Sequence, residues 1–179
     1  MNILLIDNND SFTRNLEHLL VAAIAGAQVS VRPYADLPAL DLDTPDLIVI
    51  SPGPGTPADY PGYDRVFHAG KPVLGICLGM QIMNEYKGGK TGRLTGCVHG
   101  KAERIVWRDQ ERTVARYHSL HVTRVGDGLT IMAENRQGVP MCIGSRAERL
   151  LGYQFHPESF LTQDGETFIA EALDLLGLN

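Results

Sequence analysis

Short apolar runs that alternate with helix-like segments constrain the fold of this chain most strongly. The run Asn2–Asp7 ends in an acid, 46–50 is apolar on both faces, and 72–76 leads directly into a helix-like segment. Strands that are apolar on both faces are typical of a parallel sheet covered by helices. The order of these segments predicts right-handed crossovers and a doubly wound, mostly parallel α/β sheet.

The segments between these runs have the apolar spacing of amphipathic helices. The first helix is expected to bury one face and to end at Gly26; that face comprises Phe12, Leu16, Leu19, Leu20 and Ala23. A second strand is expected at 28–32. Further helices are expected at 63–69, 78–86 and 165–177, and the stretch 33–45 is expected to be mainly a loop.

From about Gly96 the pattern changes to short strands separated by Gly, Asn and Asp turns. The strand candidates are 101–107, 112–117, 129–134, 139–144 and 149–155. We expect some of them to form a small antiparallel hairpin region and others to join the main sheet. No repeat or long linker divides the chain, so residues 1–179 are predicted to form a single domain.

Composition narrows the classes of function. The 179 residues are 44% hydrophobic and 21% charged, with a formal net charge of −5, which suits a globular domain that needs no metal or disulfide to stabilise its core. The three cysteines are Cys77, Cys97 and Cys142; their odd number and wide spacing favour a reducing, cytoplasmic location. We expect no signal peptide, no membrane-spanning stretch and no general nucleic-acid-binding role.

Cys77 is the most informative single residue, in the segment Gly75-Ile-Cys-Leu-Gly79. It lies where a buried strand is predicted to turn into a helix, and the flanking glycines permit a tight turn. This is the pattern of a nucleophile elbow with Cys in place of Ser. The partial positive charge of the helix N-terminus favours a thiolate there. We therefore interpret Cys77 as a nucleophile, and Cys97 and Cys142 as packing residues.

A thiolate nucleophile needs a base and a group that orients the base. Phe155-His-Pro-Glu158 follows the last strand candidate, whose end is expected at the same sheet edge as Cys77. Pro157 favours an extended conformation at His156, which would point His156 and Glu158 to the same side. The glycines of the loop Ser51-Pro-Gly-Pro-Gly55 allow close approach to a ligand at that edge, although a plain rigid turn is an equal alternative.

Together these motifs resemble the class I (triad) glutamine amidotransferases. The motifs, in chain order, are Leu5-Ile-Asp-Asn-Asn-Asp-Ser-Phe12, Ser51-Pro-Gly-Pro-Gly55, Gly75-Ile-Cys-Leu-Gly79 with Gln81, Val98-His-Gly-Lys101, Tyr117-His-Ser-Leu120 and Phe155-His-Pro-Glu158. The first and fourth are most similar to the small subunits of anthranilate synthase and 4-amino-4-deoxychorismate synthase. The resemblance extends from Asn2 to about Thr162.

This resemblance implies roles for individual residues. Cys77 would be the nucleophile, His156 the general base and acid, and Glu158 its orienting partner. The residues that would bind glutamine and the oxyanion are Gly53, Pro54, Gly55, Leu78, Gln81, Ser119 and Leu120. Met80 departs from the family pattern, in which many relatives carry His.

The resemblance also implies L-glutamine as substrate, no cofactor or metal in this chain, and, as the partner, a chorismate-aminating large subunit. The sequence does not separate the tryptophan pathway from the folate pathway. The alternatives are a stand-alone γ-glutamyl hydrolase or cysteine peptidase of the same fold, and a non-catalytic relative. A zinc site from Cys97, His99, His118 and His121 is disfavoured because the two pairs belong to different segments. Tyr60, Pro61 and Tyr63 either face the partner or form a surface turn.

Overall fold

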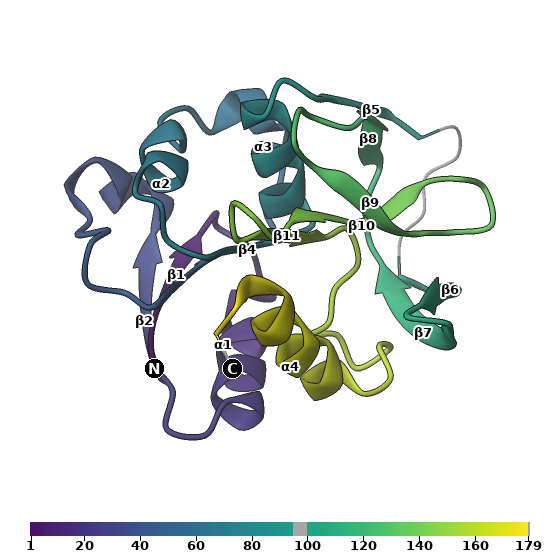
Figure 1. Ribbon diagram of the computed structural model, residues 1–179, viewed down its shortest axis with the longest axis horizontal. Coiled ribbons are helices and arrows are strands. Elements are labelled where there is room, and N and C mark those ends of the chain that lie inside the picture. Colours follow the sequence, from purple (N-terminus) through teal and green to yellow (C-terminus); the bar gives the residue numbers. More distant parts are fainter. Residues whose placement is uncertain (95–99, 179) are drawn as a thin grey trace.

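A seven-stranded sheet forms the centre of the computed structural model, which describes residues 1–94 and 100–178 (Figure 1). Its order is β2-β1-β3-β4-β11-β10-β9. The strands are β1 (Asn2–Asp7), β2 (Gln28–Pro33), β3 (Leu47–Ile50), β4 (Val73–Ile76), β9 (Thr130–Glu134), β10 (Pro140–Ser145) and β11 (Leu150–Tyr153). Neighbouring strands from β2 to β11 pair in parallel, whereas β10 pairs antiparallel with both of its neighbours, β11 and β9. The predicted doubly wound, mostly parallel sheet is confirmed.

Helices cover both faces of this sheet (Figure 1). Helices α1 (Thr13–Ala23) and α4 (Gly165–Leu176) lie on one face, and α2 (Asp64–His68) and α3 (Leu78–Tyr86) lie on the other. Each face has its own core: Leu16 and Phe168 belong to the first, and Val66 and Met83 to the second. Two short 3₁₀ helices, η1 (Tyr34–Ala39) and η2 (Pro57–Asp59), lie in the connecting segments.

Two small antiparallel sheets complete the second half. The predicted hairpin is present as β6 (Lys101–Trp107) and β7 (Gln110–Arg116). The other pair, β5 (Lys90–Arg93) and β8 (Leu120–Arg124), was not expected. Strand β5 is short and polar, with no alternation of apolar residues, so only its pairing with a distant segment makes it a strand.

The start of the first helix corrects another expectation. Phe12 precedes α1 as its N-cap residue and has no capping side chain. Its backbone N–H donates instead to the Asp10 carboxylate at 2.8 Å, in a local turn. Phe12 therefore does not contribute to the buried helical face, because its ring points to the region of His156, 5.9 Å away between ring centroids.

Strand register places the candidate catalytic segments at one edge of the sheet. β4 and β11 are parallel neighbours, with Ile76 opposite Tyr153. The Cys77 N–H donates to the Tyr153 carbonyl at 2.7 Å. The segments that follow both strands therefore leave the sheet side by side at its carboxyl end, where open parallel sheets form their sites.

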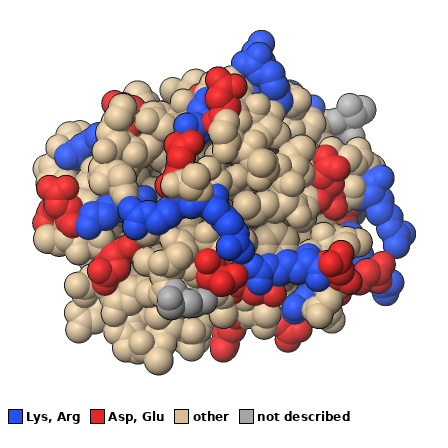
Figure 2. All heavy atoms as spheres, in the orientation of Figure 1, with Lys and Arg blue, Asp and Glu red and all other residues tan. Residues whose placement is uncertain are grey.

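On the face shown in Figure 2, Lys and Arg side chains form a nearly continuous band across the middle, and Asp and Glu lie on both sides of it. On α4, Asp174 pairs with both Arg108 and Arg146, at 2.8 and 3.6 Å. Such exposed pairs contribute little to stability. Among the residues that the structure describes, no helix combines the length and the apolar character that crossing a membrane requires.

Candidate active site

Cys77 lies in a strained turn between β4 and α3. Its φ of 52° and ψ of −100° fall where ordinary side chains are rarely found. A Cβ on Gly79 would lie 2.4 Å from the Ile50 carbonyl oxygen, and one on Gly75 would lie 2.5 Å from the Gly79 backbone. Both glycines are therefore required by close backbone approach. This geometry is that of a nucleophile elbow.

His156 and Glu158 are brought together by a turn. The Nδ1 atom of His156 lies 2.7 Å from the Glu158 carboxylate, and both side chains are buried. The Ser159 N–H donates to the His156 carbonyl at 3.3 Å, which closes a turn around Pro157 and Glu158. His156 itself forms an isolated antiparallel bridge with Ala115, as an extended residue does, but the expectation that the chain stays extended to Glu158 was wrong. The turn, rather than strand alternation, directs the carboxylate to the ring.

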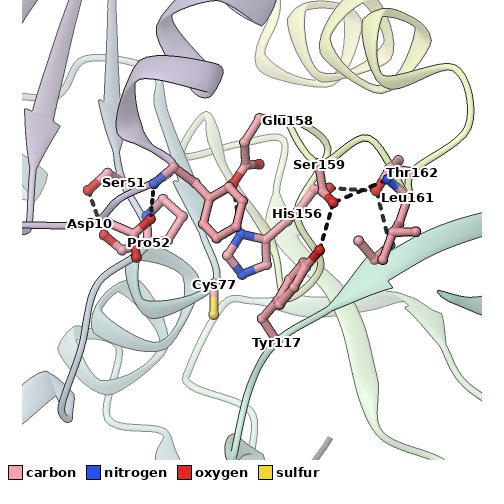
Figure 3. Close-up of polar contacts among 12 residues, drawn as sticks. Asp10, Ser51, Pro52, Cys77, Tyr117, His156, Glu158, Ser159, Leu161 and Thr162 are labelled. Atoms are coloured by element: carbon pink, nitrogen blue, oxygen red, sulfur yellow. Dashed lines mark hydrogen bonds and ion pairs between the residues drawn. The ribbon is translucent and has the colours of Figure 1, made fainter. Parts of the chain in front are cut away.

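The second ring nitrogen of His156 lies beside Cys77 (Figure 3). Within the described residues, this Nε2 atom is buried and has no hydrogen-bond partner. Burial disfavours the charged ring, but the charge of the adjacent Cys77 and the hydrogen bond to Glu158 outweigh it and raise the pKa of His156 well above its usual range. The ring is therefore prepared to hold a proton next to the thiol.

Aromatic rings and hydrogen bonds hold His156 in place. The rings of Tyr117 and Phe12 contact it edge to face, with centroids 5.1 and 5.9 Å away. The Thr162 hydroxyl donates to the His156 carbonyl at 2.5 Å, and the His156 N–H donates to Ala115 at 3.1 Å. These contacts restrict the ring and its backbone from three sides.

A cavity of about 210 Å³ lies next to Cys77. It is smaller than the pockets of about 300–1,000 Å³ that hold drug-sized ligands, which suits a ligand the size of an amino acid. The structure places all seven predicted substrate-binding residues in its wall: Gly53, Pro54, Gly55, Leu78, Gln81, Ser119 and Leu120. Leu78 begins α3, so its N–H has no acceptor in its own helix.

Asn8 holds the glycine loop against the elbow. Its side chain donates to the Ser51 carbonyl at 3.0 Å and accepts from the Tyr63 hydroxyl at 2.6 Å. Tyr60 also donates, to the Asn8 carbonyl. Both tyrosines are buried, so they do not face a partner, whereas the exposed Pro61 lies in a turn, as the surface-turn alternative expected. A Cβ on Gly53 would meet Asn8 at 2.7 Å, so the loop packs directly on this residue.

A chain of amide hydrogen bonds connects the pocket wall to the sulfur of Cys77. The side-chain amide of Gln81 donates to the Leu120 carbonyl at 3.2 Å and to the Gln154 side-chain oxygen at 3.0 Å. The Gln154 amide nitrogen lies 3.5 Å from the Cys77 sulfur and donates to it. Gln154 is fully buried. Nothing in the local sequence marked it as a functional residue.

His118 lines the same pocket and holds the Leu120 carbonyl in its wall. Its Nδ1 lies 2.6 Å from the Leu120 carbonyl, and its Nε2 accepts from Arg116 at 3.0 Å. A carbonyl can only accept, so Nδ1 carries the hydrogen and the ring is neutral. Burial and the Arg116 charge lower the pKa of His118 to about 3. Arg116 in turn forms an ion pair with Glu103.

The zinc alternative finds no support in this geometry. Both ring nitrogens of His118 are occupied, and no group of three or more potential ligands occurs within residues 1–94 and 100–178. Cys97, Val98 and His99 lie outside the described residues. Cys142 is free and buried in the core, as expected of a packing residue, and burial raises the pKa of its thiol.

Asn8, Phe12 and Gln154 are the residues near the site that sequence reasoning missed. Asn8 and Phe12 belong to the opening segment quoted for the family resemblance, which was an available signal. Gln154 immediately precedes Phe155-His-Pro-Glu158, but a single glutamine at the end of an apolar strand is not informative without its neighbours in space.

A cysteine at a strand-to-helix elbow, with a buried His–Glu pair at the same edge of a doubly wound sheet, is the arrangement of a cysteine-dependent hydrolase. Residues 4–175 match the family model for glutamine amidotransferase class-I. The chain therefore belongs to the class-I glutamine amidotransferases.

Individual relatives agree with this assignment. Anthranilate synthase component 2 from Helicobacter pylori (strain ATCC 700392 / 26695) is 35% identical, and the alignment covers 98% of each chain. Aminodeoxychorismate synthase from Streptomyces griseus is 41% identical over 98% of this chain, which spans only 26% of that longer protein. A crystal structure assigned as a GMP synthase subunit from Thermoplasma acidophilum shares the fold, with a TM-score of 0.85, 20% identity, and coverage of 99% of this chain and 94% of that one.

Proposed function

We propose that this chain is the glutaminase subunit of a chorismate-aminating synthase. Residues 1–179 act as one amidotransferase domain that hydrolyses L-glutamine and delivers ammonia to a large partner subunit. The observation that carries the proposal is the pocket, in which seven residues from three separate segments surround the space next to Cys77.

In the first step, the Cys77 thiolate attacks the side-chain amide carbon of glutamine. A carbon–sulfur bond forms, and the carbonyl oxygen becomes an oxyanion. The N–H groups of Gly55 and Leu78 are the proposed donors to this oxygen; Pro54 has no N–H and shapes the loop instead. Gln81, Ser119 and Leu120 bind the amino-acid end of the substrate.

His156 then transfers protons in both halves of the reaction. It gives a proton to the leaving nitrogen, the carbon–nitrogen bond breaks, and ammonia departs while a γ-glutamyl thioester remains on Cys77. His156 next takes a proton from water, which attacks the thioester and releases glutamate. Glu158 orients the ring and stabilises its charged form, as the 2.7 Å contact and the raised pKa of His156 support.

The names of the relatives support the identity of the acceptor. Component 2 of anthranilate synthase matches this chain over its whole length, and the longer aminodeoxychorismate synthase matches it over a quarter of its own length. We therefore propose chorismate as the compound that the partner aminates, in the tryptophan pathway, the folate pathway or both. Every proposed step in this chain uses its own side chains, backbone N–H groups and water, so the proposal requires no cofactor here. A cytoplasmic location is part of the same proposal.

Comparison of glutamine with free ammonium tests this function. The chain is purified, and glutamate release is measured alone and with anthranilate synthase component I or aminodeoxychorismate synthase component I. We expect Cys77→Ser to abolish glutamine-dependent amination of chorismate and to leave amination with ammonium salts intact. Cys142→Ser, which alters a buried cysteine away from the pocket, is the matched control.

Three results would contradict the proposal. If Cys77→Ser used glutamine at nearly the wild-type rate, Cys77 would not be the nucleophile. If the wild-type chain cleaved peptides or γ-glutamyl conjugates strongly and gave no amination with either partner, it would be a stand-alone hydrolase of the same fold. If neither activity appeared, it would be a non-catalytic relative.

A further inference from the structure

Gln154 contacts the nucleophile without lining the proposed substrate pocket. It follows β11 directly and is fully buried, and its amide nitrogen donates to the Cys77 sulfur at 3.5 Å. Its backbone is held separately by a hydrogen bond from the Gln154 N–H to the Met141 carbonyl at 3.0 Å. The side chain therefore has its own polar contacts, independent of the strand that carries it.

Its orientation is determined by the other hydrogen bonds in the chain. The Leu120 carbonyl can only accept, so the amide nitrogen of Gln81 must face it. That same nitrogen also donates to Gln154, so the oxygen of Gln154 must face Gln81. The NH₂ group of Gln154 is then left to face the sulfur of Cys77. A neutral donor that points at the sulfur stabilises a thiolate more than a thiol.

We propose that Gln154 is a positioning residue that holds the Cys77 thiolate and links it to Gln81 in the pocket wall. Its amide fixes the direction of the sulfur and stabilises its negative charge before glutamine is attacked. The role deepens the proposed glutaminase function and rests on it. Gln154 would not touch the substrate, because it is not part of the pocket wall.

Alkylation of Cys77 tests this role without any partner subunit. The full chain is treated with iodoacetamide across a range of pH, and modification of the Cys77 peptide is followed by mass spectrometry. Gln154→Met keeps the length of the side chain and removes both the donor to Cys77 and the acceptor for Gln81. Gln154→Glu keeps the acceptor for Gln81 and places an oxygen at the sulfur. Gln163→Met, an exposed glutamine in a nearby segment, is the matched control.

We expect the acid limb of the alkylation profile to move to higher pH by about one unit in Gln154→Met, and further in Gln154→Glu. On that limb the rate falls by only roughly threefold, since a more basic thiolate is also a better nucleophile. The wild-type profile should be retained in Gln163→Met. Profiles of both Gln154 variants that match the control, in proteins with unchanged thermal midpoints, would show a packing role and overturn the proposal.

Kinetics provide the second measurement. Because Gln154 lies outside the pocket wall, kcat for glutamine hydrolysis should fall by about tenfold or more in Gln154→Met while KM changes little. A change confined to KM would overturn the assignment. If the wild-type chain hydrolyses no glutamine with or without a partner, the proposed function fails. The shift of the acid limb in Gln154→Met and Gln154→Glu relative to wild type still decides the role of Gln154, because alkylation does not depend on turnover.

Discussion

Replacement of His118 by Asn should remove the loss of stability at acid pH that the buried, neutral His118 ring causes. His118 is only 3% exposed and neutral, with one nitrogen on Leu120 and the other on Arg116. Its pKa is about 3 in the folded chain, against an ordinary value of 6.5. Between these values the unfolded chain binds a proton that the folded chain does not bind, so stability falls as the pH falls below about 6.5.

The size of this effect follows from the two pKa values. Each unit of difference in pKa corresponds to about 1.36 kcal/mol. At about pH 5, proton binding by His118 in the unfolded chain therefore makes the free energy of unfolding about 2 kcal/mol lower than at neutral pH. The Asn amide nitrogen takes the place of Nδ1 and donates to the Leu120 carbonyl, but Arg116 loses its acceptor. We expect His118→Asn to be less stable near neutral pH by about 1–3 kcal/mol, and this difference to shrink by about 2 kcal/mol at about pH 5.

Urea unfolding followed by far-ultraviolet circular dichroism measures this difference. Free energies of unfolding are compared for wild type and His118→Asn between about pH 5 and 7.5. His156, with its pKa raised, contributes stability that is lost as the pH rises above the ordinary histidine range, and it is common to both proteins. His18→Asn, on the exposed side of α1, is the control. A stability difference that does not shrink toward acid pH would refute the neutral, buried state of His118.

Other substitutions test the site and the core. Glu158→Gln should slow glutamine turnover less than His156→Ala, because the role proposed for Glu158 is to orient the ring and the role proposed for His156 is to move protons; steady-state kinetics with the reverse order would contradict these roles. Gly79→Ala would place a Cβ 2.4 Å from the Ile50 carbonyl, and we expect it to lower the free energy of unfolding by about 2 kcal/mol or more. Phe168→Ala empties a buried position and should cost about 3–5 kcal/mol in urea unfolding; wild-type stability in either variant would argue against this packing.

The elbow was predictable because its signal is local. Glycines on both sides of Cys77, an apolar strand before it and a helix pattern after it are contained in a few consecutive residues. In the structure, this glycine spacing permits the strained backbone at Cys77 and the close approach of Gly79 to Ile50. The alternation of strands and helices was predictable for the same reason, since hydrophobic periodicity is a property of short segments.

Phe12 and β5 were misjudged because their roles depend on distant partners. Phe12 has the spacing of the α1 apolar face, yet the helix begins after it and its ring packs near His156. The polar segment Lys90–Arg93 becomes a strand only by pairing with Leu120–Arg124. In both cases contacts made after folding outweigh the local preference, which differs little between the alternatives.

By itself, the sequence predicted most of the strands and helices in their order, the cysteine at the elbow and the motifs that belong to the glutamine amidotransferase family. Only the tertiary structure decided that β4 and β11 are neighbours, and hence that Gln154 donates to Cys77 and that a turn brings Glu158 to His156. The physical reason is that these contacts join segments far apart along the chain. Their geometry is set by the packing of the whole sheet, which no short stretch of sequence contains.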